Sequence, residues 1–241
     1  MARAAGAAAM AAGACQILPA GLWLARPRAA LAPALAGQGR AGHVALTFDD
    51  GPDPASTPAF LDLLDDLDVA ATFFCVGEMA LRAPRLVTEI ADRGHEIGVH
   101  GWRHRNQLFR PARLHIELAR TAALLDWRSG TRPRWYRPPY GVLTGQGLLA
   151  ARSAGLRPVL WTRWGRDWEA GATPASVARE IAPGLLGGAT LLLHDTDAYS
   201  APGSWRVTLA AVPGIVASCQ DRGLTVGPLC DHGVGGGPIG R

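Results

Sequence analysis

From His43 onward, short apolar runs alternate with longer segments whose apolar residues follow a helical spacing. The short runs predict buried strands and the longer segments predict amphipathic helices. The expected strands are residues 44–48, 70–76, 96–100, 135–137, 158–161, 190–194 and 224–226. The expected helices are residues 58–67, 84–93, 113–127, 147–154, 174–181 and 207–222.

Capping signals support this pattern. Thr173 and Pro174 are typical of the start of a helix, and Gly94, Gly155 and Gly223 each follow a helical run. Strand–helix alternation repeated about seven times predicts a parallel sheet. Because the chain lacks a dinucleotide-binding fingerprint, an α/β fold with a distorted (β/α) barrel of about seven parallel strands is favoured over an open doubly wound sheet. In such barrels the active site lies at the carboxyl ends of the strands.

The pattern places one domain at residues 43–228, between an Ala-rich extension (1–42) and a Gly-rich tail expected to be flexible (229–241). Residues 4–25 carry no charge, which is compatible with a signal peptide, a membrane anchor or a segment that packs beside the domain. Ala and Gly dominate this stretch and Pro19 interrupts it, which makes a weak export signal. This weakness favours a cytoplasmic location over secretion and leaves membrane association open.

Composition narrows the function classes. Hydrophobic residues make up 48% of the chain, which excludes disorder for most of it. The net charge is +4, but the arginines are scattered and no nucleic-acid-binding module is recognisable, so a nucleic-acid partner is not expected. None of the four cysteines forms a C-x-x-C pair, which disfavours a thiolate zinc site. Cys75 is expected to be buried, and a bridge between Cys219 and Cys230 stays open.

Polar residues with catalytic chemistry follow the expected strands. Asp49 and Asp50 end the first strand, and His100 and His104 follow the third at a spacing that lets them share a metal. Asp50, His100 and His104 together make a two-histidine, one-carboxylate set with open positions, which suits a catalytic metal. Asp49 would then lie beside a water whose pKa the metal lowers, and could take its proton.

Two further strand ends carry charged residues. Arg137 emerges after the fourth strand, before two prolines, and could hold a carboxylate by a bidentate contact. His194 ends the apolar sixth strand and is a candidate general acid. Taken singly, these features also fit a polar turn or a hydrogen-bonded core histidine. Their occurrence at one end of one fold is what indicates a catalytic site.

The motifs TFDDGP (47–52), HGWRH (100–104), RPPYG (137–141) and LLLHD (191–195), with Asp167-Trp168 between the last two, resemble those of a known family. Over about residues 43–226 the chain is similar to polysaccharide deacetylases of the NodB-homology class, carbohydrate esterase family 4. The resemblance implies a distorted barrel of seven or eight strands. It also implies metal-dependent hydrolysis of the N-acetyl group of an amino sugar.

The resemblance further implies a role for each residue that matches a motif. Asp50, His100 and His104 would bind the metal, usually zinc, with cobalt or nickel as alternatives. Asp49 would be the general base, and Arg137 would orient it. The remaining roles are an oxyanion contact from the backbone N–H of Tyr140, a pocket for the acetyl methyl lined by Trp168 and Leu192, and proton donation by His194, oriented by Asp167. Amide hydrolysis needs these three functions: activated water, oxyanion stabilisation and an acid for the leaving amine.

Two positions depart from the family pattern. Gly101 stands where Ser or Thr is common, and Trp164 stands three residues before Asp167, where an acidic residue is frequent. The tryptophans at 161, 164 and 168 are therefore expected to reshape the substrate cleft. Chitin, peptidoglycan and a small amino-sugar conjugate all stay open as substrates. The alternatives to N-deacetylation are hydrolysis of another C–N bond or of acetyl esters, or sugar binding without catalysis; the oligomeric state is open.

Overall fold

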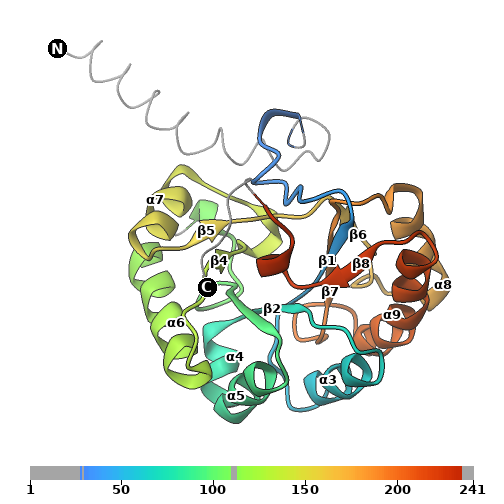
Figure 1. Cartoon of the computed structure of the whole chain (residues 1–241). Helices are drawn as coiled ribbons and strands as arrows, with labels where there is room; N and C mark the ends of the chain where they lie inside the picture. The colour runs from blue at the N-terminus through green and yellow to red at the C-terminus, as the bar shows by residue number, and fades with distance from the viewer. Residues whose placement is uncertain (1–27, 29, 110–112, 235–241) are drawn as a thin grey trace.

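Eight parallel strands form the sheet at the centre of the computed structural model, which describes residues 28, 30–109 and 113–234. The main strand order is β5-β4-β3-β2-β1-β7-β6, and β8 pairs with the start of β1. The strands are β1 (His43–Asp49), β2 (Thr72–Cys75), β3 (Glu96–Val99), β4 (Trp135–Tyr136), β5 (Arg157–Pro158), β6 (Arg163–Trp164), β7 (Thr190–His194) and β8 (Thr225–Gly227). The sheet curls into a barrel that stays open between β5 and β6 (Figure 1).

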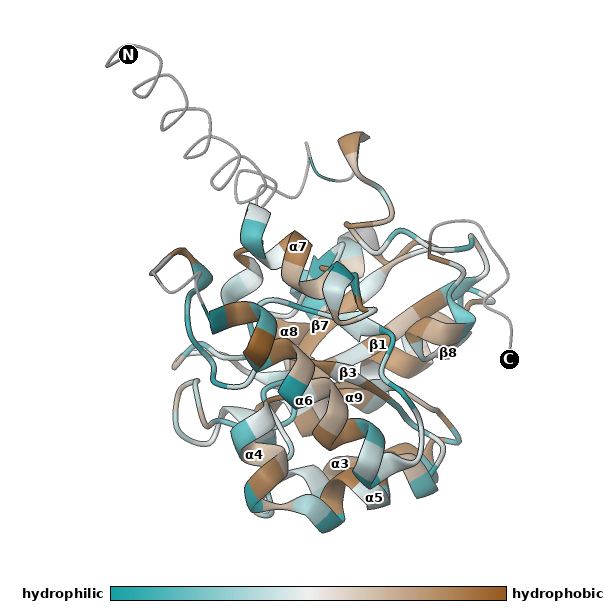
Figure 2. Cartoon of the chain, turned by 90° about the vertical axis from the view of Figure 1, so that its left-hand side faces the viewer, coloured by the Kyte–Doolittle hydropathy of each residue, from teal (hydrophilic) through white to brown (hydrophobic). Residues whose placement is uncertain are grey.

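Helices surround the curled sheet. They are α3 (Thr57–Asp66), α4 (Gly77–Arg82), α5 (Pro84–Asp92), α6 (Leu114–Ser129), α7 (Gly145–Ser153), α8 (Pro174–Ile181) and α9 (Ser204–Gln220). Short 3-10 turns lie at η1 (Gln107–Phe109), η3 (Pro139–Gly141), η4 (Ala182–Gly184) and η5 (Leu229–Asp231). The helices carry alternating brown and teal segments in Figure 2, as amphipathic helices do. Their apolar sides bury the outer face of the sheet in one large core cluster.

Strand β1 lies inside the sheet, between β2 and β7, and all seven of its residues are buried. Its register pairs Asp49 with Phe74 of β2 on one side and with His194 of β7 on the other. Because all these strands run in the same direction, their carboxyl ends meet at one edge of the barrel. The fold therefore brings the polar residues that follow β1, β3, β4 and β7 into one region.

The α/β barrel predicted from the sequence is confirmed, with one difference in the strands. Residues 158–161 were expected to form a single strand, but only Pro158 belongs to one, and β6 begins at Arg163. Between them, the N–H of Leu160 donates to the carbonyl of Leu35 (2.8 Å), so the N-terminal segment lines the open seam of the barrel. Helix α4 was not predicted at all.

Segments outside the expected domain pack against it. The hydroxyl of Thr190 donates to the carbonyl of Gly37 at 2.6 Å, so this part of the extension lies beside the barrel. The expectation of a flexible tail from residue 229 is corrected for residues 229–234, because Leu229, His232 and Val234 are buried. Residues 1–27, which carry the export question, and 235–241 lie outside the described residues.

Two sequence questions receive direct answers. Cys75, Cys219 and Cys230 are free thiols, so Cys219 and Cys230 are not bridged, and Cys75 is buried as expected. Within the described ranges, each helix is too short or too polar to span a lipid bilayer.

Candidate active site

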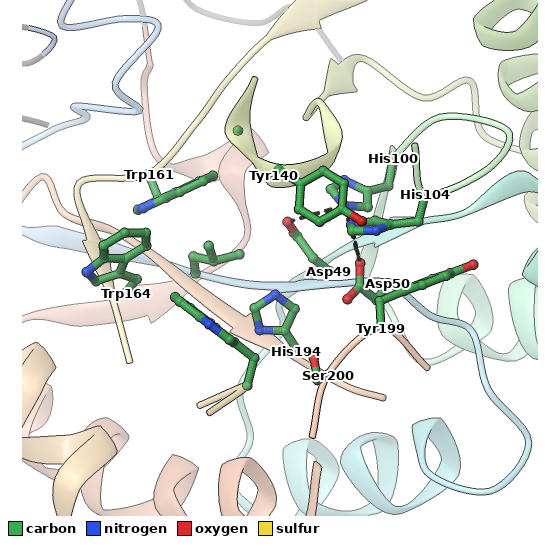
Figure 3. Close-up of a pocket in the computed structure, with 13 residues that line it drawn as sticks. Asp49, Asp50, His100, His104, Tyr140, Trp161, Trp164, His194, Tyr199 and Ser200 are labelled. Carbon is green, nitrogen blue, oxygen red and sulfur yellow. Dashed lines mark ion pairs between the residues drawn. The ribbon is translucent and has the colours of Figure 1, made fainter. Parts of the chain in front are cut away.

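A cleft of about 280 Å³ opens at the carboxyl ends of the strands, and Figure 3 shows the residues around it. Carboxylates, imidazoles and aromatic rings line it together. They are Asp49, Asp50, His100, His104, Tyr140, Gly141, Trp161, Trp164, Trp168, Leu192, His194, Tyr199 and Ser200. The cleft is slightly smaller than the usual range of about 300–1,000 Å³ for ligand sites.

Asp49 is the last residue of β1, and Arg137 holds it in place. The Arg137 Nη1 donates to Asp49 Oδ1 at 2.7 Å and to the hydroxyl of Thr47 at 2.7 Å. Thr47 lies two residues before Asp49, so the strand's alternation puts both side chains on the same face. The expected bidentate contact differs from what the structure shows, because the Arg137 Nη2 donates to the carbonyl of Leu160 (2.8 Å) and leaves Asp49 Oδ2 free of the guanidinium.

The guanidinium of Arg137 is fully buried. Burial lowers its pKa from the ordinary value, while the carboxylate of Asp49 opposes that decrease. A buried charge of this kind is stable only with an opposite charge and further acceptors around it. Asp49, Thr47 and the Leu160 carbonyl supply these partners, so the ion pair fixes the carboxylate at the floor of the cleft.

Asp50, His100 and His104 meet beside Asp49. Asp50 has a φ of 85°, so the chain leaves β1 in a left-handed turn that points its carboxylate along the cleft. Asp50 Oδ1 lies 3.3 Å from His100 Nε2 and 3.2 Å from His104 Nε2. One ligand atom from each residue lies within 4.8 Å of the other two.

These three residues fit a divalent metal ion. Asp50 Oδ1 is buried and has no hydrogen-bond partner among the described residues. His100 Nδ1 lies 2.9 Å from the carbonyl of Arg137, which can only accept, so Nδ1 carries the proton and Nε2 keeps its lone pair. A buried carboxylate oxygen without a hydrogen-bond partner, facing two imidazole nitrogens, is a donor set that suits a divalent metal ion.

The charges and the burial around Asp50 and His104 also favour the protonation states in which these two side chains bind a metal. Burial opposes ionisation of Asp50, but the imidazoles of His100, His194 and His104 outweigh it and lower the pKa of the carboxyl to about 2. Burial lowers the pKa of His104 to about 4, with Asp50 opposing this decrease. At neutral pH the carboxylate is therefore ionised and the His104 imidazole is neutral, as metal binding requires.

His194 stands across the cleft and pairs with Asp167. Its Nδ1 lies 3.1 Å from Asp167 Oδ1, and its backbone N–H donates to Asp167 Oδ2 at 2.8 Å. Thr208 donates to the same Oδ2 (2.8 Å). Burial opposes protonation of the imidazole, but the carboxylates of Asp167, Asp50 and Asp49 outweigh it and raise the pKa of His194 to about 10. His194 is therefore a proton donor at neutral pH.

Aromatic rings form two walls of the cleft. Trp161 stacks on Trp164 (5.8 Å between centroids), Trp164 meets the edge of Trp168 (5.3 Å), and Trp168 contacts His194. Leu192 packs with Trp161 in the same wall. The expectation that Trp164 reshapes the cleft thus has a structural counterpart, because its indole joins the other two into a continuous surface. On the other side of His194 stand Tyr140 and Tyr199 (Figure 3).

The ten residues to which the sequence assigned a catalytic, metal-binding or substrate-binding role all line this cleft or contact a residue that does. They are Asp49, Asp50, His100, His104, Arg137, Tyr140, Asp167, Trp168, Leu192 and His194. The structure adds Thr47, Tyr199 and Ser200. Thr47 was detectable, because it shares a strand face with Asp49. Tyr199 and Ser200 follow β7 in an irregular loop, where no spacing rule indicates which side chains face the site. Gly101 has a φ of +89°, a conformation that favours glycine.

Comparisons with known proteins identify related sequences. The family model for polysaccharide deacetylase matches residues 36–159. A chitooligosaccharide deacetylase from Bradyrhizobium sp. (strain ANU 289) is 34% identical over 198 residues, covering 77% of this chain and 88% of the relative.

Two solved structures illustrate the range of related folds. One is a peptidoglycan N-acetylglucosamine deacetylase in complex with a substituted benzamide; it is 30% identical with a TM-score of 0.74 and covers 81% of this chain and 90% of its own. The other is a family 4 acetyl xylan esterase from Clostridium thermocellum in complex with a cobalt ion. It is 30% identical with a TM-score of 0.69 and covers 77% of this chain and 87% of its own.

Proposed function

Because the chain belongs to the polysaccharide deacetylase family, as its motifs predicted, we propose that it is a metal-dependent hydrolase that removes N-acetyl groups from amino sugars. One observation carries the proposal. A buried Asp–Arg pair, an Asp–His–His cluster and a protonated His–Asp pair face one another across a single cleft. This combination supplies the base, the electrophile and the acid that amide hydrolysis requires.

Asp50, His100 and His104 would hold the ion, and zinc suits this nitrogen and oxygen donor set, with cobalt and nickel as alternatives. When bound, the ion supplies Lewis-acid activation of water and of the amide carbonyl. The three ligands follow the carboxyl ends of β1 and β3, so they would hold the ion from the floor of the barrel and leave the cleft to the substrate.

Asp49 would act as the general base. The guanidinium of Arg137 donates a hydrogen bond to Asp49 Oδ1. Asp49 Oδ2 faces the proposed metal ligands and lies 3.8 Å from His100 Nε2. A carboxylate held by one oxygen has the other available to accept a proton from the attacking water. The ion pair with Arg137 fixes the position of Asp49, so the carboxylate needs no reorganisation during the reaction.

His194 would protonate the leaving amine from the opposite side. Its charge is stabilised by Asp167, and Trp168 contacts its ring, which fixes the imidazole in the cleft. Trp168 and Leu192 would enclose the methyl of the acetyl group. The backbone N–H of Tyr140 would help to stabilise the oxyanion.

Two alternative functions differ in how well the observations support them. Hydrolysis of acetyl esters is supported by the similarity to an acetyl xylan esterase, since the same residues could cleave either bond. Sugar binding without catalysis is disfavoured, because Asp49, Asp50, His100, His104 and His194 are all present and converge. The cytoplasmic location favoured by the weak N-terminal signal stays a prediction that cell fractionation would test.

Acetate release measured on three substrate classes tests the proposal. The substrates are N-acetylglucosamine monomer and oligomers, a soluble peptidoglycan fragment, and acetylated xylan, each with and without a chelator. We expect chelator-sensitive release from at least one N-acetylated substrate and less from xylan. Release from xylan alone would establish the ester alternative, and binding of the oligomers without release from any substrate would establish the non-catalytic one.

A further inference from the structure

The two histidines of the Asp–His–His cluster are supported in different ways. The Nδ1 of His100 is fixed by the carbonyl of Arg137 at 2.9 Å. The Nδ1 of His104 is buried and has no hydrogen-bond partner among the described residues. An imidazole that binds a metal through Nε2 almost always has its other nitrogen hydrogen-bonded, which sets the orientation of the ring. His104 lacks that support, so something else must fix its ring.

Two tyrosine rings enclose His104. The ring of Tyr199 stacks on the imidazole with 4.4 Å between centroids and an interplanar angle of 19°. The ring of Tyr140 meets the imidazole at 4.4 Å with an angle of 63°. The close stacking of Tyr199 and the edge contact of Tyr140 restrict rotation of the imidazole about its χ2 angle. In this arrangement the Nε2 of His104 points to Asp50 Oδ1, 3.2 Å away.

The loop that carries Tyr199 is itself tied down. Thr196 Oγ1 donates to Asp53 Oδ2 (2.8 Å), and the N–H of Gly203 donates to Asp197 Oδ2 (2.5 Å). The N–H of Ala201 donates to the carbonyl of Trp168 at 3.1 Å. These bonds anchor both ends of the segment 196–203. Tyr199 is therefore presented to His104 from a fixed loop, although 42% of the residue is exposed.

We propose that Tyr199 is a positioning residue: its ring, with Tyr140, orients the imidazole of His104 for metal binding in place of a hydrogen bond. This inference rests on the proposed metal site. It assigns the loop after β7 a part in metal affinity, which the family motifs do not include. The stacked ring performs this role, and the tyrosine hydroxyl is not required.

Titration of Zn²⁺ into metal-stripped full-length protein by calorimetry tests the inference on four variants. Tyr199→Leu removes the ring and Tyr199→Phe removes only the hydroxyl. Asp50→Ala removes a proposed ligand. Trp127→Leu removes an exposed aromatic ring on α6, outside the cleft, and serves as the matched control. Absorption spectra of the Co²⁺-loaded proteins report the coordination geometry, and thermal unfolding of the metal-free proteins reports the fold.

We expect Tyr199→Leu to weaken Zn²⁺ binding about 10-fold and to alter the Co²⁺ spectrum, the size of effect seen when outer supports of metal ligands are lost. Tyr199→Phe and Trp127→Leu should bind as the parent protein does. If Tyr199→Leu keeps full affinity and spectrum while Asp50→Ala loses binding, the positioning role is wrong and the metal site stands. If the parent protein binds no Zn²⁺, the metal site fails, and the inference fails with it.

Discussion

The carboxylate of Asp195 accepts a hydrogen bond from the backbone N–H of Gly51 at 3.1 Å, across 144 residues of sequence. The same carboxylate accepts from the hydroxyl of Thr57 at 2.5 Å. Gly51 follows Asp50 directly, so this pair fixes the turn that points Asp50 into the cleft. A side chain at position 51 would collide with Asp195, because an added Cβ would lie 2.2 Å from Asp195 Oδ2.

Replacing Asp195 should therefore weaken both fold and metal site. Asp195→Ala leaves the N–H of Gly51 and the hydroxyl of Thr57 without their acceptor in the protein interior, which costs about 1–3 kcal/mol for each group. Urea unfolding of the metal-free protein measures this loss. Asp62→Ala, which removes one exposed contact of Arg93, is the control and should cost less than about 1 kcal/mol. Equal stability of the two variants would contradict the role of Asp195.

Arg137→Lys is expected to reduce kcat/KM about 100-fold, the scale of loss for a misplaced catalytic group. A lysine ammonium lacks the planar guanidinium that reaches Asp49, Thr47 and the Leu160 carbonyl at once. Steady-state kinetics on an N-acetylglucosamine oligomer measures the loss, and Arg93→Lys at an exposed ion-pair network is the control. Parent-like kinetics in Arg137→Lys would show that the ion pair does not position the base.

Asp167→Asn should move the alkaline limb of the kcat profile to lower pH. The Asp167 charge raises the pKa of His194 to about 10 against the opposing effect of burial, and the imidazole must be protonated to act as an acid. Without that charge, the proton is lost at lower pH, and kcat at pH 8 falls by about 100-fold or more. The test is kcat measured from pH 6 to 10, and an unmoved alkaline limb would assign it to another group.

The buried pair His43 and His232 should make the folded protein less stable at acidic pH. Their Nδ1 atoms lie 2.8 Å apart, so one ring donates and the other accepts, and the accepting ring must be neutral. Burial, helped by the charge of Arg40, lowers the pKa of His43 to about 4; burial and the His43 ring do the same for His232. Between about pH 6.5 and 4 the unfolded chain binds protons that the folded chain does not. Stability is therefore complete above pH 7 and decreases as the pH falls through this window.

We expect a decrease on the order of 4 kcal/mol in the free energy of unfolding between pH 7.5 and pH 5 from this pair, about 2 kcal/mol from each ring. Urea unfolding at both pH values measures it. His232→Gln should be less stable at pH 7.5 and should lose less on acidification. The same pH dependence in His115→Gln, an exposed histidine on α6, is the expected control result. An unchanged pH dependence in His232→Gln would place the acid sensitivity elsewhere.

Local sequence was sufficient for much of the site. Asp49 and Asp50 could be placed at a strand end, and parallel topology then required them to meet His100, His104 and His194. Contacts between residues far apart in the chain could not be predicted from the local sequence. Strand 158–161 ended early because Leu35, more than a hundred residues away, occupies its edge.

The C-terminal segment shows the same limit. Residues 229–234 read as part of a tail because glycines are frequent from Gly233 onward and the short segment indicates no helix or strand. His232 is nevertheless buried against His43, and the N–H of Cys230 donates to Glu96 at 3.0 Å. Tyr199 was missed for a related reason: a loop residue's direction depends on the hydrogen bonds of the whole loop, and periodicity says nothing about it.

The most direct test of the central claim is Asp49→Asn, with acetate release and bound Zn²⁺ measured on the same purified sample. Asn keeps the size of the side chain and the contact with Arg137 but cannot accept the proton of water. The account predicts about one equivalent of bound Zn²⁺ and acetate release reduced by at least about 100-fold. Acetate release at the parent rate with Zn²⁺ bound would contradict the assignment of Asp49 as the general base.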